Sequence, residues 1–277
     1  MINTPNEIIK GNINGAVTKG NLKFSKMFAL GIAAGMFIAL GGATSSTAVH
    51  AIANVGLART LAGVIFPVGL LMIVLVGGEL FTGNCLMIMA TMDKKISVLQ
   101  LIRNLVIVFI SNLIGSLIID FLIFYSGNLD YSGGGLGAYT IKVAIGKVAL
   151  SPTKCVSSGI LCNILVCIAI LMGASSKDIA GKVLAIWFPI FAFVIGGFEH
   201  IVANMFYIPM GMIAATNSDY VAKAEELYGI TSEQVATLNF GGLIHNFIPV
   251  TIGNILGGMV FIGCIMYYIQ IQCEKNN

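Results

Sequence analysis

After Lys26 the chain alternates between long apolar runs and short polar connections, with runs at about 27–43, 61–92, 104–125, 155–174, 183–215 and 243–271. A helix that spans a lipid bilayer needs about 20 mainly apolar residues. Four runs fit one span each, but the second and fifth contain 32 and 33 residues. A continuous helix of that length would reach about 48 Å, well beyond a hydrocarbon core of about 30 Å. Polar residues interrupt both runs in the middle, so each is predicted to form two half-helices separated by a non-helical break.

The two overlong runs contain related segments. Residues 76–84 read Val-Gly-Gly-Glu-Leu-Phe-Thr-Gly-Asn, and residues 195–204 read Ile-Gly-Gly-Phe-Glu-His-Ile-Val-Ala-Asn. The third and sixth runs also share a pattern, at residues 110–115 and 252–257. Because each repeat holds three spans, which is an odd number, the two halves are expected to be inverted in the membrane. Paired broken helices in inverted repeats favour a binding or conduction site near the midplane.

The residues before the first long run have a different pattern. Positions 4–20 are predicted to form a short helix, because Thr4 and Glu7 have the spacing of a capping box and Pro5 suits a first turn. Its apolar stripe recurs every four residues, at Ile9, Ile13 and Val17. An amphipathic helix of this kind lies at the interface between lipid and water.

Composition agrees with a polytopic membrane protein. The chain of 277 residues is 57% hydrophobic and 10% charged, with a mean hydropathy of +0.93, whereas soluble domains carry about 25% charged residues. This excludes a secreted disulfide scaffold, a disordered chain and an ordinary cytosolic enzyme. The 15 Lys and Arg nearly balance the 12 Asp and Glu, so nucleic acid is not an expected partner. The six cysteines have no metal-ligand spacing, so neither a metal nor a cofactor is expected.

Charge in the connections predicts the orientation. With the N-terminus inside, ten of the 15 Lys and Arg lie in the cytoplasm and five lie outside, so the positive-inside rule places both termini in the cytoplasm. The whole chain, 1–277, is predicted to be a single transmembrane domain. Its parts are an N-terminal segment (1–26), a first repeat (27–125), an outer connecting segment (126–154), a second repeat (155–271) and a tail (272–277).

Three ionisable residues stand inside the overlong runs: Glu79, Glu199 and His200. A charged group at the centre of a bilayer costs about 2.5–3.5 kcal/mol, so such residues face the protein interior and pair with other groups. We interpret the two glutamates, together with Asn84, chiefly as structural groups that hold the non-helical segments. Cation coordination and proton relay by the glutamates remain alternatives.

His200 lies at the break of the fifth run. Helix N-termini exposed at such a break favour an anion, and imidazole can share a proton with it. His200 is therefore predicted to line the path of an anion, and Asn204 shares its helix face and can donate its amide to the same species. A satisfied core histidine is the alternative.

The break of the second run is placed at residues 80–84. Leu80 and Phe81 are expected to form a hydrophobic constriction, Thr82 to hydrogen-bond the solute or His200, and Gly83 to allow the backbone to turn. A packed helix kink is the alternative.

Residues 136–150 form an amphipathic stretch in which Tyr139, Val143 and Lys147 share one face. On the outer side, Lys147 opposes the positive-inside rule and would raise the local concentration of anions at a pore mouth. A solvated surface lysine is the alternative.

Four segments resemble signatures of the formate/nitrite transporter family. They are residues 78–84 (Gly-Glu-Leu-Phe-Thr-Gly-Asn), 160–167 (Ile-Leu-Cys-Asn-Ile-Leu-Val-Cys), 197–205 (Gly-Phe-Glu-His-Ile-Val-Ala-Asn-Met) and 248–254 (Ile-Pro-Val-Thr-Ile-Gly-Asn). They occur in the family's order, and the match covers essentially the whole chain. Within the family the sequence is most similar to bacterial hydrosulfide channels.

The resemblance implies an all-α, aquaporin-like protomer with six transmembrane helices in two inverted three-helix repeats, assembled as a homopentamer with one pore per subunit. In this match His200 is the central pore histidine, Thr82 the threonine bonded near it, Asn204 the neighbouring asparagine and Lys147 the lysine of the outer vestibule. The implied constrictions are an outer one at Phe66 and Phe193 and an inner one at Leu70, Leu80 and Phe81.

The sequence therefore predicts a multi-pass channel in the bacterial cytoplasmic membrane, embedded in the lipid bilayer. Its substrate is a small inorganic or carboxylate anion of a weak acid, first hydrosulfide and then formate or nitrite. The same motifs also suit a proton-coupled secondary transporter for formate or nitrite. An intramembrane enzyme is disfavoured, because no metal-ligand spacing or nucleophile motif accompanies the buried ionisable residues.

Overall fold

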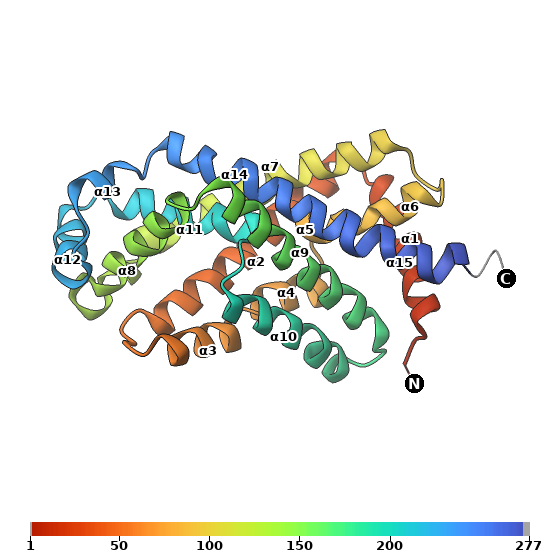
Figure 1. The fold of residues 1–277 in the computed structure, drawn as a ribbon, viewed down its shortest axis with the longest axis horizontal. Coiled ribbons are helices and arrows are strands. Elements are labelled where there is room, and N and C mark those ends of the chain that lie inside the picture. Colours follow the sequence, from red (N-terminus) through yellow and green to blue (C-terminus); the bar gives the residue numbers. More distant parts are fainter. Residues whose placement is uncertain (1, 274–277) are drawn as a thin grey trace.

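The computed structural model describes residues 2–273, and helices dominate this part of the chain. Six helical segments are long and apolar enough to cross a membrane (Figure 1). They are α2 (Phe24–Val49), α3 with α4 (Val55–Ile65 and Val68–Val76), α7 (Val98–Tyr125), α9 (Pro152–Ser175), α10 (Ile179–Gly196) and a C-terminal helix that continues from α14 (Phe240–Ile255) to Gln272. The six predicted spans are confirmed, and the chain is a multi-pass membrane protein. The predicted tail lies outside the described residues from position 274 onward.

The second and fifth spans are broken, as predicted. α4 ends at Val76, and a short helix, α5 (Phe81–Asn84), begins after a non-helical segment and leads through a 3₁₀ turn to α6 (Ile88–Met92). In the second half, α10 ends at Gly196 and α11 (Ile201–Ala214) follows another non-helical segment.

The position of the first break differs from the sequence prediction. Residues 80–84 were expected to be non-helical, but Phe81–Asn84 is helical and the break lies at residues 77–80. Gly77 makes the turn with a φ of 108°, and Gly197 does so in the second break with a φ of 65°. These positive φ values suit glycine, because a Cβ atom disfavours them. Gly83, the expected turning residue, lies inside α5.

A buried asparagine holds each break. Nδ2 of Asn112 on α7 donates to the carbonyl oxygens of Gly31 (2.8 Å) and Glu79 (2.9 Å), and its Oδ1 accepts from the backbone N–H of Phe81 (3.0 Å). The amide therefore ties α2, the break and the start of α5 to α7. It supplies partners to backbone groups that water cannot reach.

The second half repeats this arrangement. Nδ2 of Asn254 on α14 donates to the carbonyl oxygens of Gly159 (2.8 Å) and Glu199 (2.9 Å), and its Oδ1 accepts from the backbone N–H of Ile201 (2.9 Å). The matching contacts show that the chain is built from two three-helix repeats. Since the spans of each repeat are odd in number, the repeats are inverted, and the broken helices meet at the centre in an aquaporin-like arrangement.

The helices outside the spans gather at two ends of the molecule. α1 (Pro5–Gly20) begins with the predicted Thr4–Glu7 capping box and lies near the chain termini (Figure 1). α8 (Tyr131–Val148), α12 (Ser218–Tyr228) and α13 (Ser232–Ala236) lie at the opposite end, which we call the α8 end. The amphipathic stretch is thus part of α8, whereas the sequence reading did not anticipate α12 and α13.

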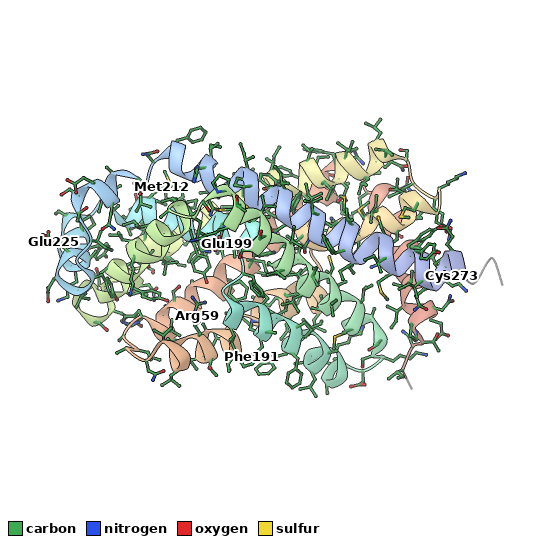
Figure 2. All side chains as sticks on the ribbon, viewed as in Figure 1. Arg59, Phe191, Glu199, Met212, Glu225 and Cys273 are labelled. Carbon is green, nitrogen blue, oxygen red and sulfur yellow. The ribbon has the colours of Figure 1, made fainter. Side chains whose placement is uncertain are left out.

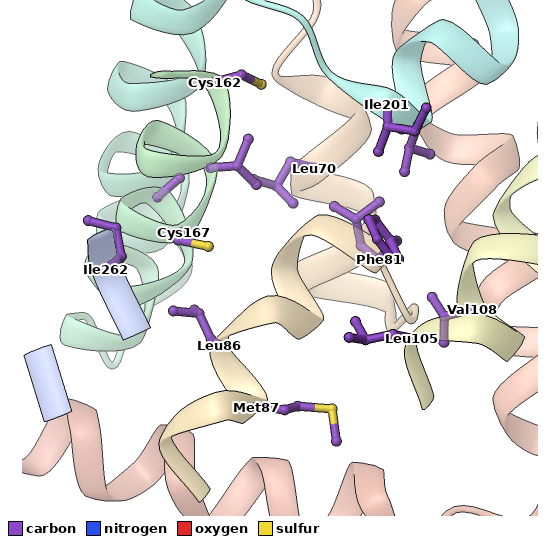
Figure 3. Packing of buried hydrophobic residues seen from close by; sticks show 14 of the residues in the cluster. Leu70, Phe81, Leu86, Met87, Leu105, Val108, Cys162, Cys167, Ile201 and Ile262 are labelled. Carbon is purple, nitrogen blue, oxygen red and sulfur yellow. The ribbon is translucent and has the colours of Figure 1, made fainter. Parts of the chain in front are cut away.

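The half-helices meet inside the main apolar core. Leu70 of α4, Phe81 of α5 and Ile201 of α11 belong to one buried cluster, together with Cys162 and Cys167 of α9 (Figure 3). The two breaks therefore lie deep in the protein, which is where the sequence placed its candidate site residues.

Candidate functional site

His200 and Thr82 bring the two breaks together. His200 immediately precedes α11, Thr82 lies in the first turn of α5, and Nε2 of the imidazole is 2.8 Å from Oγ1 of the hydroxyl. Both side chains are buried. The pair joins the two inverted repeats at the centre of the molecule.

The other ring nitrogen of His200 has a fixed role. The backbone N–H of Ala203 donates to Nδ1 at 3.2 Å, so the side chain caps the helix that follows it. A nitrogen that accepts carries no proton, and the neutral ring therefore holds its proton on Nε2. In this geometry Nε2–H donates to the Thr82 hydroxyl, and a second ring proton would break the cap at Ala203.

A small apolar chamber adjoins His200. It has a volume of about 10 Å³ and is lined by Ile38, Phe66, Leu70, Leu80, Val166, Ile190, Phe193 and His200. The rings of Phe66 and Phe193 are 5.5 Å apart in an edge-to-face arrangement, and Phe193 lies 5.9 Å from the imidazole. Four of the five predicted constriction residues thus surround this chamber. Phe81 is not among its lining residues and packs edge-to-face on Phe109 at 5.2 Å.

A much larger cavity of about 970 Å³ opens at the α8 end, and we call it the vestibule. Phe66, Phe193 and His200 line both the vestibule and the chamber, so the two aromatic rings and the imidazole stand at the passage between them. The vestibule wall also carries Lys147, and Glu199 is the one acidic residue among its lining residues. The cavity is therefore predominantly cationic.

Lys147 and Glu199 form a buried ion pair at the floor of the vestibule. Nζ of Lys147 is 2.9 Å from Oε1 of Glu199 and 5.2 Å from the centre of the Tyr207 ring. Oε2 of Glu199 accepts from Nδ2 of Asn204 at 2.7 Å, and the same amide donates to Oδ1 of Asn246 at 2.8 Å. Asn204 thus serves the carboxylate and lines neither cavity.

The α1 end carries the matching network. Nζ of Lys19 on α1 is 3.1 Å from Oε1 of Glu79 and donates to Oδ1 of Asn84 at 2.7 Å. Nδ2 of Asn84 donates to Oε2 of Glu79 (2.6 Å) and to Oδ1 of Asn104 (2.7 Å). Each intramembrane glutamate is therefore neutralised by a lysine from a helix outside the spans and hydrogen-bonded by an asparagine of the half-helix that follows it.

These networks correct the interpretation of the glutamates. Their carboxylates were expected to tie down the non-helical segments, but the amides of Asn112 and Asn254 bond those segments, while the carboxylates bind lysine and asparagine. The sequence patterns contained both asparagines only as parts of a repeat. Their signal was an amide in the middle of an apolar run, where an unpaired polar group is costly.

The symmetry is broken at the centre. A shift of 120 positions relates Glu79 to Glu199 and Asn84 to Asn204, and the same shift places Leu80 opposite His200 in the repeat. The scaffold is therefore duplicated, but only the second half carries an imidazole at this position. Within the described residues there is no group of three or more His, Cys, Asp and Glu that could hold a metal ion.

Known proteins share this sequence and this architecture. The family model described as formate/nitrite transporter matches residues 6–268. A probable formate transporter of Methanothermobacter thermautotrophicus is 37% identical over 275 residues, which cover 93% of each chain. The formate channel FocA of Haemophilus influenzae is 36% identical and covers 96% of this chain and 94% of its own.

A solved structure extends the likeness to the fold. A pentameric formate channel with formate bound has a TM-score of 0.78 and 34% identity, covering 89% of this chain and 97% of its own. The sequence match, the paired broken helices and the central imidazole together lead to one assignment. The chain belongs to the formate/nitrite transporter family, a family of channels and transporters.

Proposed function

We propose that the chain forms a membrane channel for small monovalent anions of weak acids. The observation that carries this proposal is the order of environments along one path: a cationic vestibule, two aromatic rings, a buried imidazole and an apolar chamber. The vestibule attracts anions, whereas an apolar chamber makes a bare charge costly and excludes hydrated ions. A species that shares or carries a proton passes such a chamber most readily.

The position of His200 defines how a proton is shared. Nε2–H points to Thr82 and can hydrogen-bond an anion that displaces or joins the hydroxyl. The neutral ring cannot give this proton up, because it would become an imidazolate. His200 therefore lowers the cost of the anion by a charge-assisted hydrogen bond, and a full proton reaches the anion from the water of the vestibule.

The size of the chamber supports hydrosulfide as the substrate. A cavity of about 10–15 Å³ holds one water-sized species, and the chamber has a volume of about 10 Å³. Hydrosulfide has one heavy atom, so it needs less rearrangement of the lining side chains than formate does. Formate has three, so side chains such as Leu70 and Leu80 must move to admit it.

The relatives support formate as the second candidate. The relatives named above are described as formate channels or transporters, at 36–37% identity over nearly the whole chain. A substrate comparison decides between the two anions. Hydrosulfide, formate, nitrite and acetate flux should be measured in the same proteoliposomes against protein-free vesicles.

We expect hydrosulfide to cross fastest and acetate, the bulkiest, to cross slowest. Formate entry without hydrosulfide entry would reject hydrosulfide as substrate, and flux no faster than in empty vesicles would reject the channel itself. A pH gradient imposed without a substrate gradient separates a channel from a proton-coupled transporter, because only obligatory coupling drives uphill uptake.

We further propose a homopentamer in the bacterial cytoplasmic membrane. A channel of 34% identity with nearly the same fold is pentameric, and this chain exposes large apolar side chains on α7 and α14, such as Val106, Ile110 and Ile248, which suit lipid or a neighbouring subunit. Cross-linking in native membranes tests the assembly. We propose that both termini lie in the cytoplasm, because the excess of positive charge in the connections favours that orientation. Protease protection of terminal tags in sealed vesicles tests it.

A further inference from the structure

The vestibule wall carries four cationic side chains, and three of them are already engaged. Lys147 pairs with Glu199 at 2.9 Å and Lys223 pairs with Glu226 at 2.9 Å. Nζ of Lys142 stands 4.1 Å above the centre of the Tyr228 ring. The fourth is Arg59, which has no hydrogen bond or ion pair within the part of the chain that the structure describes.

Arg59 stands where the vestibule narrows. It lies on α3, and the face that carries it continues through Ala62 to Phe66, all three of which line the vestibule. The spacing from Arg59 to Phe66 is seven residues, or about 10 Å along a helix. The Arg59 side chain, which is labelled in Figure 2, thus stands about two helical turns before the aromatic passage.

The guanidinium rests against the second break. A methyl group added to Gly197 would overlap Nη1 of Arg59, so the head group lies directly beside the backbone that leads to Glu199 and His200. Gly197 has no side chain to cover it, and Arg59 remains exposed to the cavity. The guanidinium therefore lies beside Gly197, which is three positions before the central imidazole in the chain.

The geometry of guanidinium defines what it selects. Its planar fork binds two oxygens of a carboxylate in parallel, whereas an ammonium group acts as a point charge. We propose that Arg59 is a docking site in the vestibule for planar monovalent oxyanions such as formate and nitrite. The site favours these ions over hydrosulfide, whose single sulfur cannot engage both arms. The inference rests on the proposed function and adds a step that discriminates among its substrates.

A structural role for Arg59 predicts a different result. A positive charge near the last carbonyl groups of α10 also stabilises that helix through its dipole. Lysine keeps that charge but removes the fork, so Arg59→Lys separates the two roles. Lys154→Gln is the matched control, because it removes one positive charge from an exposed lysine that is not among the lining residues of the vestibule.

The experiment measures half-saturating concentration and maximal flux for formate and hydrosulfide in proteoliposomes at low ionic strength. We expect Arg59→Lys and Arg59→Gln to raise the half-saturating concentration of formate about tenfold, the effect of about 1.4 kcal/mol from one charge-assisted contact. The half-saturating concentration of hydrosulfide should be unchanged in Arg59→Lys, and Lys154→Gln should resemble the wild type for both anions. Wild-type formate saturation in Arg59→Lys would overturn the proposal, and so would an equal loss of maximal flux for both anions.

A binding measurement keeps the docking site separate from transport. Thermal unfolding in detergent is compared in sodium formate and in sodium chloride of equal ionic strength, because a ligand that binds the folded state raises the unfolding temperature. We expect formate to raise it in the wild type and not in Arg59→Lys. If the wild type binds formate through Arg59 but carries no flux, the proposed function fails and the docking site stands. If formate has no effect on the wild type, the docking site fails.

Discussion

Nε2 of His200 and Oγ1 of Thr82 lie 2.8 Å apart, although 118 positions separate them in the sequence and they belong to opposite repeats. Their hydrogen bond is buried and crosses the point where the half-helices meet. Because Nδ1 accepts from the N–H of Ala203, the Nε2–H group donates its hydrogen bond to the Thr82 hydroxyl. The position of Thr82 after the first break therefore determines where the imidazole of the second break directs its Nε2–H group.

Removing the hydroxyl should impair conduction. Thr82→Val keeps the shape of the side chain but leaves the buried Nε2–H without its acceptor, a cost of about 1–3 kcal/mol. We expect the flux of the preferred anion to fall about tenfold or more and its pH dependence to change. Thr82→Ser, which restores the hydroxyl, should recover most of the flux in stopped-flow measurements on proteoliposomes.

The matched control is Thr18→Val, since Thr18 is on α1 and bonds only the carbonyl oxygen of Asn14. It should conduct like the wild type. His200→Ala completes the comparison, because it removes the proton donor itself. Wild-type flux with an unaltered pH profile in both Thr82→Val and His200→Ala would remove proton sharing from the mechanism.

The ion pair of Lys147 and Glu199 should contribute strongly to stability. The side chain of Lys147 is 16% exposed and that of Glu199 only 6%, so Lys147→Met leaves a carboxylate uncompensated in the interior. Breaking a buried pair in this way costs about 3–5 kcal/mol, whereas replacing both partners is often nearly neutral. We expect Lys147→Met to unfold at a clearly lower temperature than Lys147→Met/Glu199→Gln in detergent. Equal destabilisation by the single and double variants would contradict this reading.

The equivalent pair at the α1 end should be weaker. The side chain of Lys19 is 35% exposed, compared with 16% for Lys147, so water and salt screen it more. A double-mutant cycle of Lys19→Met and Glu79→Gln should give a smaller coupling energy than the cycle at Lys147 and Glu199. Raising the salt concentration should reduce the Lys19 coupling further. A larger, salt-insensitive coupling energy for Lys19 would show that exposure to solvent does not control the strength of these ion pairs.

The sequence revealed the broken spans because a bilayer restricts what an apolar run can contain. Glu79 and Glu199 interrupt runs already too long for one span, so a break near each was the consistent solution. It did not reveal which glycine makes the first turn. Gly77 and Gly83 both lie within four positions of Glu79. Which of them makes the turn depends on Asn112, which bonds the backbone N–H of Phe81 from another helix.

Local sequence patterns also could not predict side-chain contacts between residues that are far apart in the chain. Lys19 lies in the N-terminal helix that the sequence places at the interface between lipid and water, yet its side chain pairs with Glu79, 60 positions away. The sequence did not single out Arg59, because a cation near the end of a span is common. Its importance follows from its neighbours: Lys142, Lys147 and Lys223 each have a partner, whereas Arg59 has no hydrogen bond or ion pair among the residues that the structure describes. Such elimination requires the packed structure.

The asparagine that holds the second break should be essential for folding. Asn254→Leu would leave the carbonyl oxygens of Gly159 and Glu199 and the N–H of Ile201 without the partners that the amide supplies. Each unpaired buried group costs about 1–3 kcal/mol, so the variant should accumulate poorly in membranes and unfold early in detergent. The matched control is Asn14→Leu, which alters an exposed asparagine on α1. If the Asn254 variant were as stable as the control, the amide would not hold the break.

The close packing of α2 against α7 within the first repeat can be tested by adding one methyl group. Gly35 on α2 lies so near α7 that a Cβ atom would overlap the backbone carbonyl of Asn112, whereas nothing lies within 4 Å of a Cβ at Gly15 on α1. Gly35→Ala therefore has to push α2 away from α7, and overpacking of this kind costs about 1–3 kcal/mol. Gly15→Ala should instead stabilise its helix by about 0.5–1 kcal/mol, because alanine is the better helix former. Thermal unfolding should thus move in opposite directions for the same chemical change. Destabilisation by both variants would mean that the effect does not come from the α2–α7 contact.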